Sequence, residues 1–352
     1  MTAPSVRRDG PLAQRKADHV HVVAERDTAM RRPSGFEAIE FEHCALPEIA
    51  LDQIDLRAKF LGRVLEAPLM VTAMTGGCEE AAAINRDLAA ACDEEGVVFG
   101  LGSMRAAVDE PGLADTYAVR AVAPHVFLCG NLGAVQLKAI SLPALERLVS
   151  RLGCDALCVH LNPMHEAIQV GGDTDWRGVQ MAIANACWSL PVPVIAKEVG
   201  GGINPGVATK LEATGVAAID ISGAGGTSWS GGVESYRGAG PEALTYWDWG
   251  IPTALALRDA VRTVRVPIIA SGGIRNGLDA AKALRLGAVL AGAAAPFLKA
   301  QQRGGREAVR DELRQWKREI RLACFGTGSP DLDALRKAPL YRTLGRTLEG
   351  ER

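Results

Sequence analysis

The sequence has few aromatic side chains and little net charge. Aromatic residues make up 5% of its 352 residues, and 39 Lys and Arg are balanced by 41 Asp and Glu. A chain so close to neutrality has no general attraction for nucleic acid or for an anionic membrane surface. The scarcity of aromatics, together with 39 Gly, argues against a β-sandwich and favours repeated strand–loop–helix turns.

Membrane spans and cysteine metal motifs are also missing. No run of about 18 apolar residues occurs, so we expect no transmembrane helix. The segment 1–19 lacks the apolar core of a secretory signal, and the eight cysteines are scattered without a second pair to complete a zinc motif. We therefore expect reduced, mostly buried cysteines in a cytoplasmic enzyme.

The chain does contain eight short apolar runs that end at or near Gly, Asn or Ser. Amphipathic stretches such as 80–96 and 142–153 separate most of them. Parallel strands alternating with helices in this number predict a (β/α)8 TIM barrel, whose active site forms at the carboxyl ends of the strands. A doubly wound sheet is the alternative, but it usually has fewer strands and one dominant glycine fingerprint. The expected strands are 68–77, 97–104, 125–133, 156–162, 193–202, 217–226, 266–274 and 288–295.

The barrel leaves a segment at each end of the chain. We expect an N-terminal extension over 1–60 that contributes to the substrate site, a barrel over 61–300 and a C-terminal helical tail over 301–352. The longest connection, 227–265, contains three of the six Trp. A decorated loop of this length acts either as a lid or as a subunit contact.

Glycines after the last two expected strands predict a phosphate site. SGGIRNG at 271–277 and LAGAAA at 290–295 would let backbone N–H groups approach an anion, and Arg275 would add charge. The alternative is that the glycines only allow tight packing of strand against helix. Because the loops after strands seven and eight often bind phosphate in barrels, we favour a phosphate-bearing cofactor or substrate.

Polar residues follow the earlier strands as well. Lys197 ends the fifth expected strand, where it would form a Schiff base or stabilise an anionic cofactor; the alternative is a salt bridge to Glu198 or Asp220. Small polar rims suited to a flat ligand occur at AMTGG (73–77), GSM (102–104) and GNLG (130–133).

The motif HLNPMHE (160–166) clusters further polar side chains after the fourth strand. Glu166 would bind a hard cation such as Mg²⁺, and His165 would act as an acid or base. From the residues alone, a carboxylate that opens the next helix and a surface histidine are slightly favoured. Similarly, Arg15, Lys16 and His19 would fold over a diphosphate, although a solvated charged tail is the commoner role of such a cluster.

Together these motifs resemble the type 2 isopentenyl-diphosphate isomerases, which are flavin-dependent. RKADH, AMTGG, GSM, HLNP followed by E, KEVG, SGAGGTSW and SGGIR occur in the family's order, over about residues 14–300. The resemblance implies a barrel that binds FMN and Mg²⁺, with NADPH or another source of reduced flavin. It also implies isomerisation of isopentenyl diphosphate to dimethylallyl diphosphate in a homo-oligomer, commonly a tetramer or octamer.

The resemblance assigns individual roles too. It implies His165, Glu234 and Lys197 as catalytic candidates and Glu166 as the Mg²⁺ ligand. The implied substrate ligands are Arg15, Lys16, His19, Asn162 and His165. The implied FMN contacts are Ala73, Met74, Thr75, Ser103, Asn131, Lys197, Ser222, Thr227, Gly272, Gly273, Arg275, Ala291 and Gly292.

Three departures from the family's pattern fall on the substrate side. The family usually has Gln at the position of His165, and its PEGD-like run is VGGD at 170–173, which loses a carboxylate. The loop TSWSGGVE is one residue longer than the usual TSWxxxE, so we expect Glu234 to be displaced. A divergent member acting on another prenyl or unsaturated substrate in specialised terpenoid metabolism is therefore the alternative function. A hydroxy-acid oxidase on a related barrel would need a catalytic His in the SGGIR segment, and no His follows His165; a non-catalytic flavin-binding role is the least favoured alternative.

Overall fold

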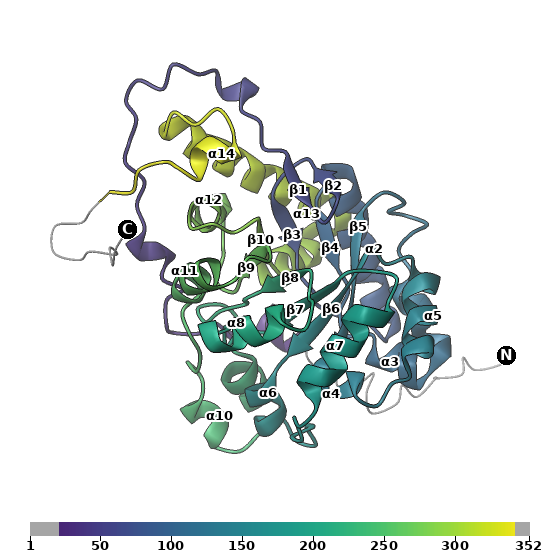
Figure 1. The fold of residues 1–352 in the computed structure, drawn as a ribbon. Helices are drawn as coiled ribbons and strands as arrows, with labels where there is room; N and C mark the ends of the chain where they lie inside the picture. The colour runs from purple at the N-terminus through teal and green to yellow at the C-terminus, as the bar shows by residue number, and fades with distance from the viewer. Residues whose placement is uncertain (1–20, 342–352) are drawn as a thin grey trace.

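The computed structural model describes residues 21–341, and its centre is a closed barrel of eight strands (Figure 1). Each strand pairs in parallel with its neighbour, and β10 returns to β3 to close the ring. The predicted (β/α)8 barrel is confirmed, and every strand lies inside one of the expected runs. The strands are β3 (Leu69–Val71), β4 (Val98–Gly100), β5 (Phe127–Gly133), β6 (Ala156–Leu161), β7 (Val194–Glu198), β8 (Ala218–Asp220), β9 (Ile268–Ser271) and β10 (Leu290–Ala293).

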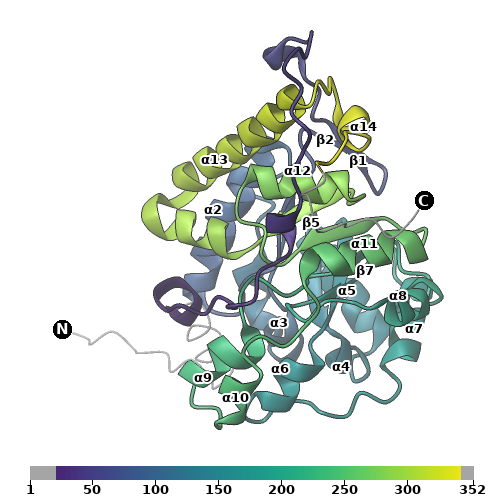
Figure 2. The same ribbon diagram turned by 90° about the vertical axis from the view of Figure 1, so that its left-hand side faces the viewer.

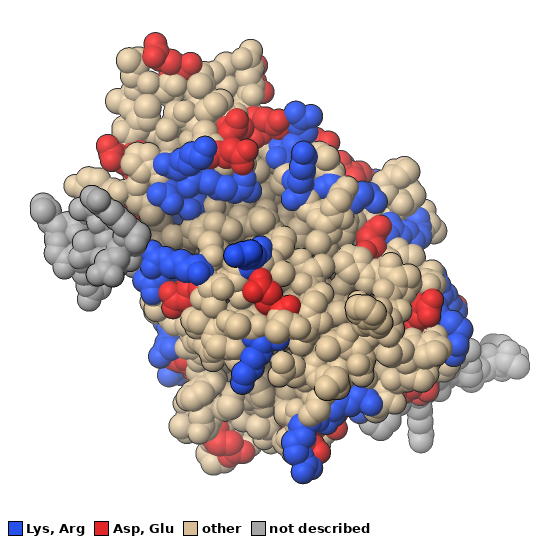
Figure 3. All heavy atoms as spheres, viewed as in Figure 1, with Lys and Arg blue, Asp and Glu red and all other residues tan. Residues whose placement is uncertain are grey.

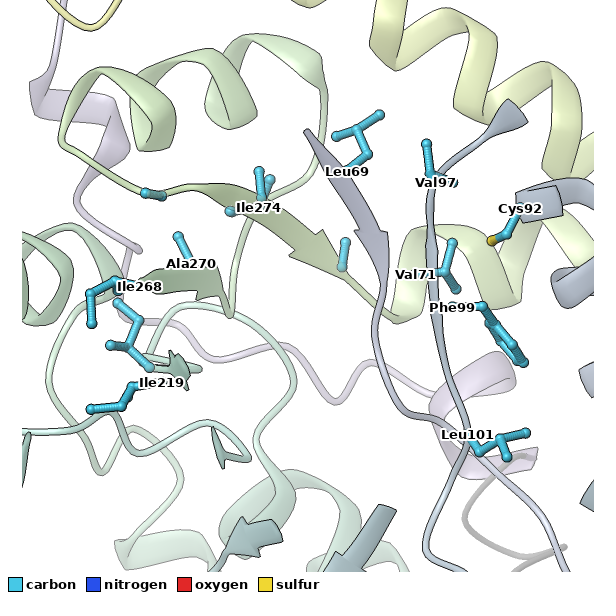
Figure 4. Close-up of a cluster of buried hydrophobic side chains, with 14 of the residues drawn as sticks. Leu69, Val71, Cys92, Val97, Phe99, Leu101, Ile219, Ile268, Ala270 and Ile274 are labelled. Carbon is cyan, nitrogen blue, oxygen red and sulfur yellow. The ribbon is translucent and has the colours of Figure 1, made fainter. Parts of the chain in front are cut away.

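Alternation along the strands divides the core into two layers. Leu69 and Val71 of β3 pack in the outer layer between barrel and helices, with Phe99 of β4 beside them (Figure 4). Met70 and Val98 belong to the inner layer that fills the barrel. This is the two-residue periodicity expected of strands buried on both faces.

Helices surround the barrel, and two of them end at a glycine in the left-handed conformation. Gly96 and Gly153 adopt left-handed φ of 60° and 64° at the ends of α2 and α5, which matches the expected stretches 80–96 and 142–153. The helices are α2 (Glu79–Glu95), α3 (Arg105–Asp109), α4 (Ala134–Leu137), α5 (Leu142–Leu152), α6 (Pro163–Ile168), α7 (Val179–Ser189), α8 (Pro205–Glu212), α9 (Glu234–Tyr236), α10 (Glu242–Thr245), α11 (Thr253–Thr263), α12 (Gly277–Arg285), α13 (Ala295–Gly326) and α14 (Leu332–Leu335). Short turns are η1 (Phe36–Ala38), η2 (Leu51–Gln53), η3 (Pro111–Tyr117) and the π-helical η4 (Trp229–Val233).

One end of the barrel is closed by a hairpin. β1 (Ala58–Phe60) and β2 (Arg63–Leu65) pair antiparallel outside the barrel sheet. Phe60 and Leu65 join the inner core layer, and the Phe60 ring meets Phe127 edge-on at 5.5 Å. Because this hairpin fills the amino-terminal end, the opposite end is left for a ligand.

The segment before the hairpin runs along the outside of the molecule (Figure 2). It begins at the barrel mouth, where the Met30 amide donates to Gly226. Lys282 of α12 then donates to the Phe36 carbonyl at 2.9 Å, and the Cys44 amide reaches Gly326 at the end of α13. The N-terminal segment therefore ties the mouth of the barrel to its C-terminal helices.

The long helix α13 crosses residue 300 and lies beside α2 (Figure 2). Glu95 of α2 accepts from Arg314 and Lys317, each at 2.7 Å. Gly304 and Gly305 have non-helical backbone angles, so the helix changes direction between its first nine residues and the rest.

The surface carries mixed charge. On the face shown in Figure 3, Lys and Arg lie interspersed with Asp and Glu, and broad areas carry neither. Within residues 21–341, no helix combines the length and apolarity needed to cross a bilayer.

Candidate functional site

A cavity of about 620 Å³ opens at the carboxyl ends of the barrel strands. Its lining includes three carboxylate side chains and six that carry positive charge, a balance suited to anionic groups. The six cationic residues are Arg26, Arg105, Lys197, Arg275, Lys299 and Arg303.

Part of the wall is built from glycine backbone after β8 and β9. Gly272 and Gly273 have φ of +94° and +73°, in the region that glycine favours. A Cβ at Gly272 would lie 2.1 Å from the Gly223 carbonyl oxygen, and one at Gly226 would lie 2.7 Å from the Gly273 amide. The two loops therefore pack backbone to backbone, and only glycine leaves room for a ligand to reach their N–H groups.

The amino terminus of α13 faces the same part of the cavity. Ala293, Ala294 and Ala295 line it, whereas the predicted contacts Ala291 and Gly292 lie inside β10 and not on the wall. The difference arises because peptide groups inside the strand are used for pairing, and those at the strand end and helix start are the ones available to a ligand. Lys299 on the first turns of α13 adds charge.

Most of the other predicted FMN contacts do line the cavity. Ser222, with an unusual φ of +33°, lies at the wall, and the Arg275 guanidinium reaches the Gly225 carbonyl at 3.1 Å. Thr75 is buried behind the wall, and its hydroxyl has no hydrogen-bond partner among residues 21–341. The predicted contacts on the wall are Ala73, Met74, Ser103, Asn131, Lys197, Ser222, Thr227, Gly272, Gly273 and Arg275.

Lys197 ends β7 with its ammonium group buried at the cavity floor. Its Nζ donates to the Glu198 carbonyl at 2.6 Å and lies 3.5 Å from the Asp220 carboxylate. The Glu198 carboxylate accepts from the amides of Val199, Gly200 and Gly201, and its burial raises its pKa. The salt bridge considered as an alternative is present with Asp220, yet Lys197 also lines the cavity, so both roles are compatible.

His165 and Glu234 meet at the opposite wall. His165 follows β6 on α6, and its Nε2 lies 2.9 Å from Glu234 Oε1; both residues are buried. The ring of Trp229, which also lines the cavity, lies 5.7 Å from the His165 ring. Two segments far apart in the sequence, α6 and the loop that contains Trp229 and Glu234, therefore come together here.

A π turn brings Glu234 to this position. The five residues Trp229–Val233 form one π-helical turn, so a residue beyond the usual helical repeat is absorbed locally. Ser228 Oγ accepts from the amides of Gly231 and Gly232 and donates to the Trp247 carbonyl at 2.6 Å. We expected the longer loop to displace Glu234 from the site; Glu234 does not itself line the cavity, but its carboxylate hydrogen-bonds to His165, which does.

Glu166 is the best-placed ligand for a hard cation. Its carboxylate accepts from Asn162 Nδ2 at 2.9 Å, from Gln169 Nε2 at 3.2 Å and from the Asp173 amide at 2.8 Å. Residues 21–341 bring no three His, Cys, Asp or Glu together around a metal. Gly171, in the run that lacks the family's carboxylate, has φ of +71° and open space around a Cβ. Glu166 therefore fits Mg²⁺ whose other ligands are phosphate oxygens and water.

Several cavity residues were not predicted from the sequence. Arg105 follows the GSM motif and pairs with Asp173 at 3.1 Å, and Arg303 belongs to the segment that we expected to be a tail. Arg26 was missed because it lies in a segment with no strand or motif to anchor it. The predicted substrate ligands Arg15, Lys16 and His19 lie outside the described residues.

The loop after Trp229 packs on the N-terminal segment. Trp247 Nε1 donates to the Ala29 carbonyl at 2.9 Å, and the amides of Arg31 and Arg32 donate to Asp248. Thr28 and Ala29 line the cavity, so this loop supports one of its walls.

Two relatives named as isomerases match almost the whole chain. It is 49% identical over 335 residues to the isopentenyl-diphosphate delta-isomerase of Xanthobacter autotrophicus, spanning 93% of this chain and 97% of that protein. It is 44% identical to the enzyme of the same name from Pyrococcus furiosus, spanning 94% of this chain and 86% of that one.

A family model and solved structures agree on the architecture. Residues 160–342 match the model described as FMN-dependent dehydrogenase. A flavocytochrome b2 with pyruvate bound superposes with a TM-score of 0.68 at 17% identity over 95% of this chain and 86% of that one. An (S)-mandelate dehydrogenase gives 0.67 at 16% identity over 94% and 96%. The distant structures establish the shared barrel, and the close relatives establish that this chain belongs to the isopentenyl-diphosphate delta-isomerase family.

Proposed function

We propose that the protein isomerises isopentenyl diphosphate to dimethylallyl diphosphate with bound FMN and Mg²⁺. The observation that carries the proposal is the convergence of the family's motifs on one cavity. Met74, Ser103, Asn131 and Lys197 come from four different strand ends and line it together. The 49% identity to an isomerase over nearly the full chain supports the same reaction.

The two walls of the cavity would bind different ligands, FMN on one and the substrate on the other. The glycine loops after β8 and β9, Arg275 and the start of α13 would hold the FMN phosphate, because exposed N–H groups and a helix amino terminus stabilise an anion. When bound and reduced, FMN supplies proton transfer and stabilisation of positive charge on the alkene. Lys197 keeps a positive charge on the cavity floor, which favours an anionic ring beside it.

The opposite wall would hold the substrate. Glu166 would bind Mg²⁺, and Arg105 with the metal would fix the diphosphate. Trp229 lines the cavity on this side, where its π system would stabilise positive charge developing on the hydrocarbon end. His165 donates a hydrogen bond to Glu234 as a Gln amide would, so this pair retains a polar group where the family usually has Gln.

Three further expectations belong to this proposal. NADPH or another reductant would supply reduced flavin, and the assembly would be a homo-oligomer, commonly a tetramer or octamer. All eight cysteines are free thiols, which supports a reducing, cytoplasmic setting.

The test is anaerobic turnover by the purified protein with FMN, NADPH, Mg²⁺ and isopentenyl diphosphate. We expect dimethylallyl diphosphate to form, with no net oxidation of the flavin. Absence of product with fully reduced, bound flavin would overturn the proposal.

A divergent prenyl or unsaturated substrate is the second candidate, because His165 departs from the family at the substrate wall. The variant His165→Gln separates the two. Isomerase activity that stays the same or falls supports isopentenyl diphosphate as the native substrate. A rise of about tenfold or more, well beyond ordinary scatter among variants, would favour another substrate.

A further inference from the structure

Arg237, at the end of α9, is bound to the catalytic wall without lining the main cavity. Its Nη1 lies 2.9 Å from Glu234 Oε1 and 2.8 Å from Oε2. The Glu234 side chain is 1% exposed and that of Arg237 is 16% exposed. A carboxylate removed from water this completely is costly unless a cation and hydrogen bonds compensate it. Arg237 therefore contributes two of the hydrogen bonds that compensate the burial of the Glu234 carboxylate behind His165.

The hydrogen bonds of this wall have a direction. Asn162 must turn its Nδ2 toward Glu166, because a carboxylate only accepts. The same Nδ2 lies 3.4 Å from His165 Nδ1, which places the lone pair of the ring on that nitrogen. The other ring nitrogen, Nε2, then carries the hydrogen and donates to Glu234. Asn162 on one side and Glu234 on the other therefore favour the same tautomer of His165, and loss of either contact weakens that preference.

The guanidinium has few other partners that would explain its burial. Among residues 21–341, its side-chain hydrogen bonds all go to Glu234, and its Nε–H has none. The far side of Arg237 faces a second cavity, also lined by Arg26 and Tyr236. Without the arginine, Glu234 would lose two charge-assisted hydrogen bonds, and its orientation toward His165 would be less well defined.

We propose that Arg237 is a positioning residue that holds Glu234 against His165 and so fixes the orientation and tautomer of the His165 ring. The kinetic part of this inference rests on the proposed function, whereas the structural part does not. The π turn is a precondition, because it places Glu234 between the arginine and the histidine.

The first test is NMR of the histidine ring nitrogens in the full-length protein with FMN bound, at one fixed pH and without Mg²⁺. The His165 signals are assigned by their loss in His165→Gln. In the unmodified protein we expect hydrogen on Nε2 and not on Nδ1. In Arg237→Gln we expect a mixture of tautomers, and in Arg237→Lys the original one. An unchanged His165 signal in a folded Arg237→Gln protein would overturn the proposal.

The second test is a kinetic cycle with isopentenyl diphosphate. We expect Arg237→Gln to lower kcat about tenfold or more with KM changed less than about twofold, and Arg237→Lys to recover most of the loss. In a Glu234→Gln background, Arg237→Gln should have little further effect, because the residue that it holds is gone. A full additional loss there would contradict action through Glu234.

The matched control is Arg151→Gln, which removes another arginine–carboxylate pair. Arg151 donates to Asp115 at 2.8 Å on the outer surface, and both side chains are exposed. It should change neither the kinetics nor the NMR signal. If the unmodified protein shows no isomerase activity, the proposed function fails, and the NMR comparison still decides the role of Arg237.

Discussion

The two walls of the cavity are made from different materials. The wall near α13 is backbone: Gly226, Gly272 and Gly273 pack against one another so closely that no side chain fits. The wall near α6 is a network of side chains in which Asn162, His165 and Glu234 fix one another. Only glycine fits at these positions of the backbone wall. The side-chain wall tolerates substitutions as long as hydrogen-bond donors and acceptors still match. The departures from the family accordingly fall on the second wall.

The largest expected effect breaks only the side-chain wall. Glu166→Gln removes the carboxylate that we propose to bind Mg²⁺ but keeps a hydrogen-bonding group of the same size. A bound metal contributes several kcal/mol to such a reaction, so kcat/KM should fall on the order of a thousandfold. Steady-state rates across a Mg²⁺ titration measure this. FMN affinity should stay within about twofold, since Glu166 lies on the other wall; a parallel loss of FMN would show that the walls are not separate.

The next effect breaks only the backbone wall. In Gly272→Ala the new Cβ would lie 2.1 Å from the Gly223 oxygen at a φ of +94°, so the loop must move. A strain of about 3 kcal/mol corresponds to roughly a hundredfold weaker FMN binding. Fluorescence titration of the apoprotein measures it, with thermal unfolding to show that the variant folds. Gly112→Ala, where a Cβ meets open space, is the control. Unchanged FMN affinity in Gly272→Ala would show that the glycine backbone of this wall does not bind FMN.

A smaller effect concerns the support behind the side-chain wall. Trp247→Phe deletes the hydrogen bond from Nε1 to the Ala29 carbonyl but keeps an aromatic ring near Arg31. One such bond is worth about 1 kcal/mol, so we expect KM for the diphosphate to rise about fivefold. Trp188→Phe, at a 92% exposed position, serves as the control and should leave KM unchanged.

The smallest expected effect tests whether a cysteine side chain supports either wall of the cavity. Burial raises the pKa of Cys154 and Cys324 to about 12, so at pH 8 both stay protonated and unreactive, and their reactivity should grow only as pH rises. A thiol reagent at pH 8 should label Cys44 first, because the other partly exposed cysteine, Cys187, has a pKa raised by burial. Activity should survive that labelling. Loss of activity in step with the first thiol would show that a cysteine supports one of the walls.

The sequence predicted the backbone wall better than the side-chain wall. Glycine-rich strand ends are recognisable locally, so SGGIR pointed to Gly272 and Gly273, which line the cavity. The π turn depends on distant contacts: Gly231 packs on the backbone of Trp247, and Ser228 hydrogen-bonds to the same residue. No local pattern contains that information. Lys299 and Arg303 were missed for a related reason. They lie in α13, whose helical pattern continues without a break from the cavity into the segment that we expected to be a tail.

The π turn also determines where a gap belongs when the sequence of this chain is aligned with those of its relatives. If the spacing of TSWxxxE is imposed without a gap, the acidic column falls on Val233, which is fully buried and apolar. The extra residue belongs inside Trp229–Val233, because a π-helical turn contains one residue more than an α-helical hydrogen-bonded turn. An automatic transfer of site labels that places its gap elsewhere would record a missing acid, although Glu234 is present and paired. For this chain, the position of that single gap decides whether Glu234 is counted as present.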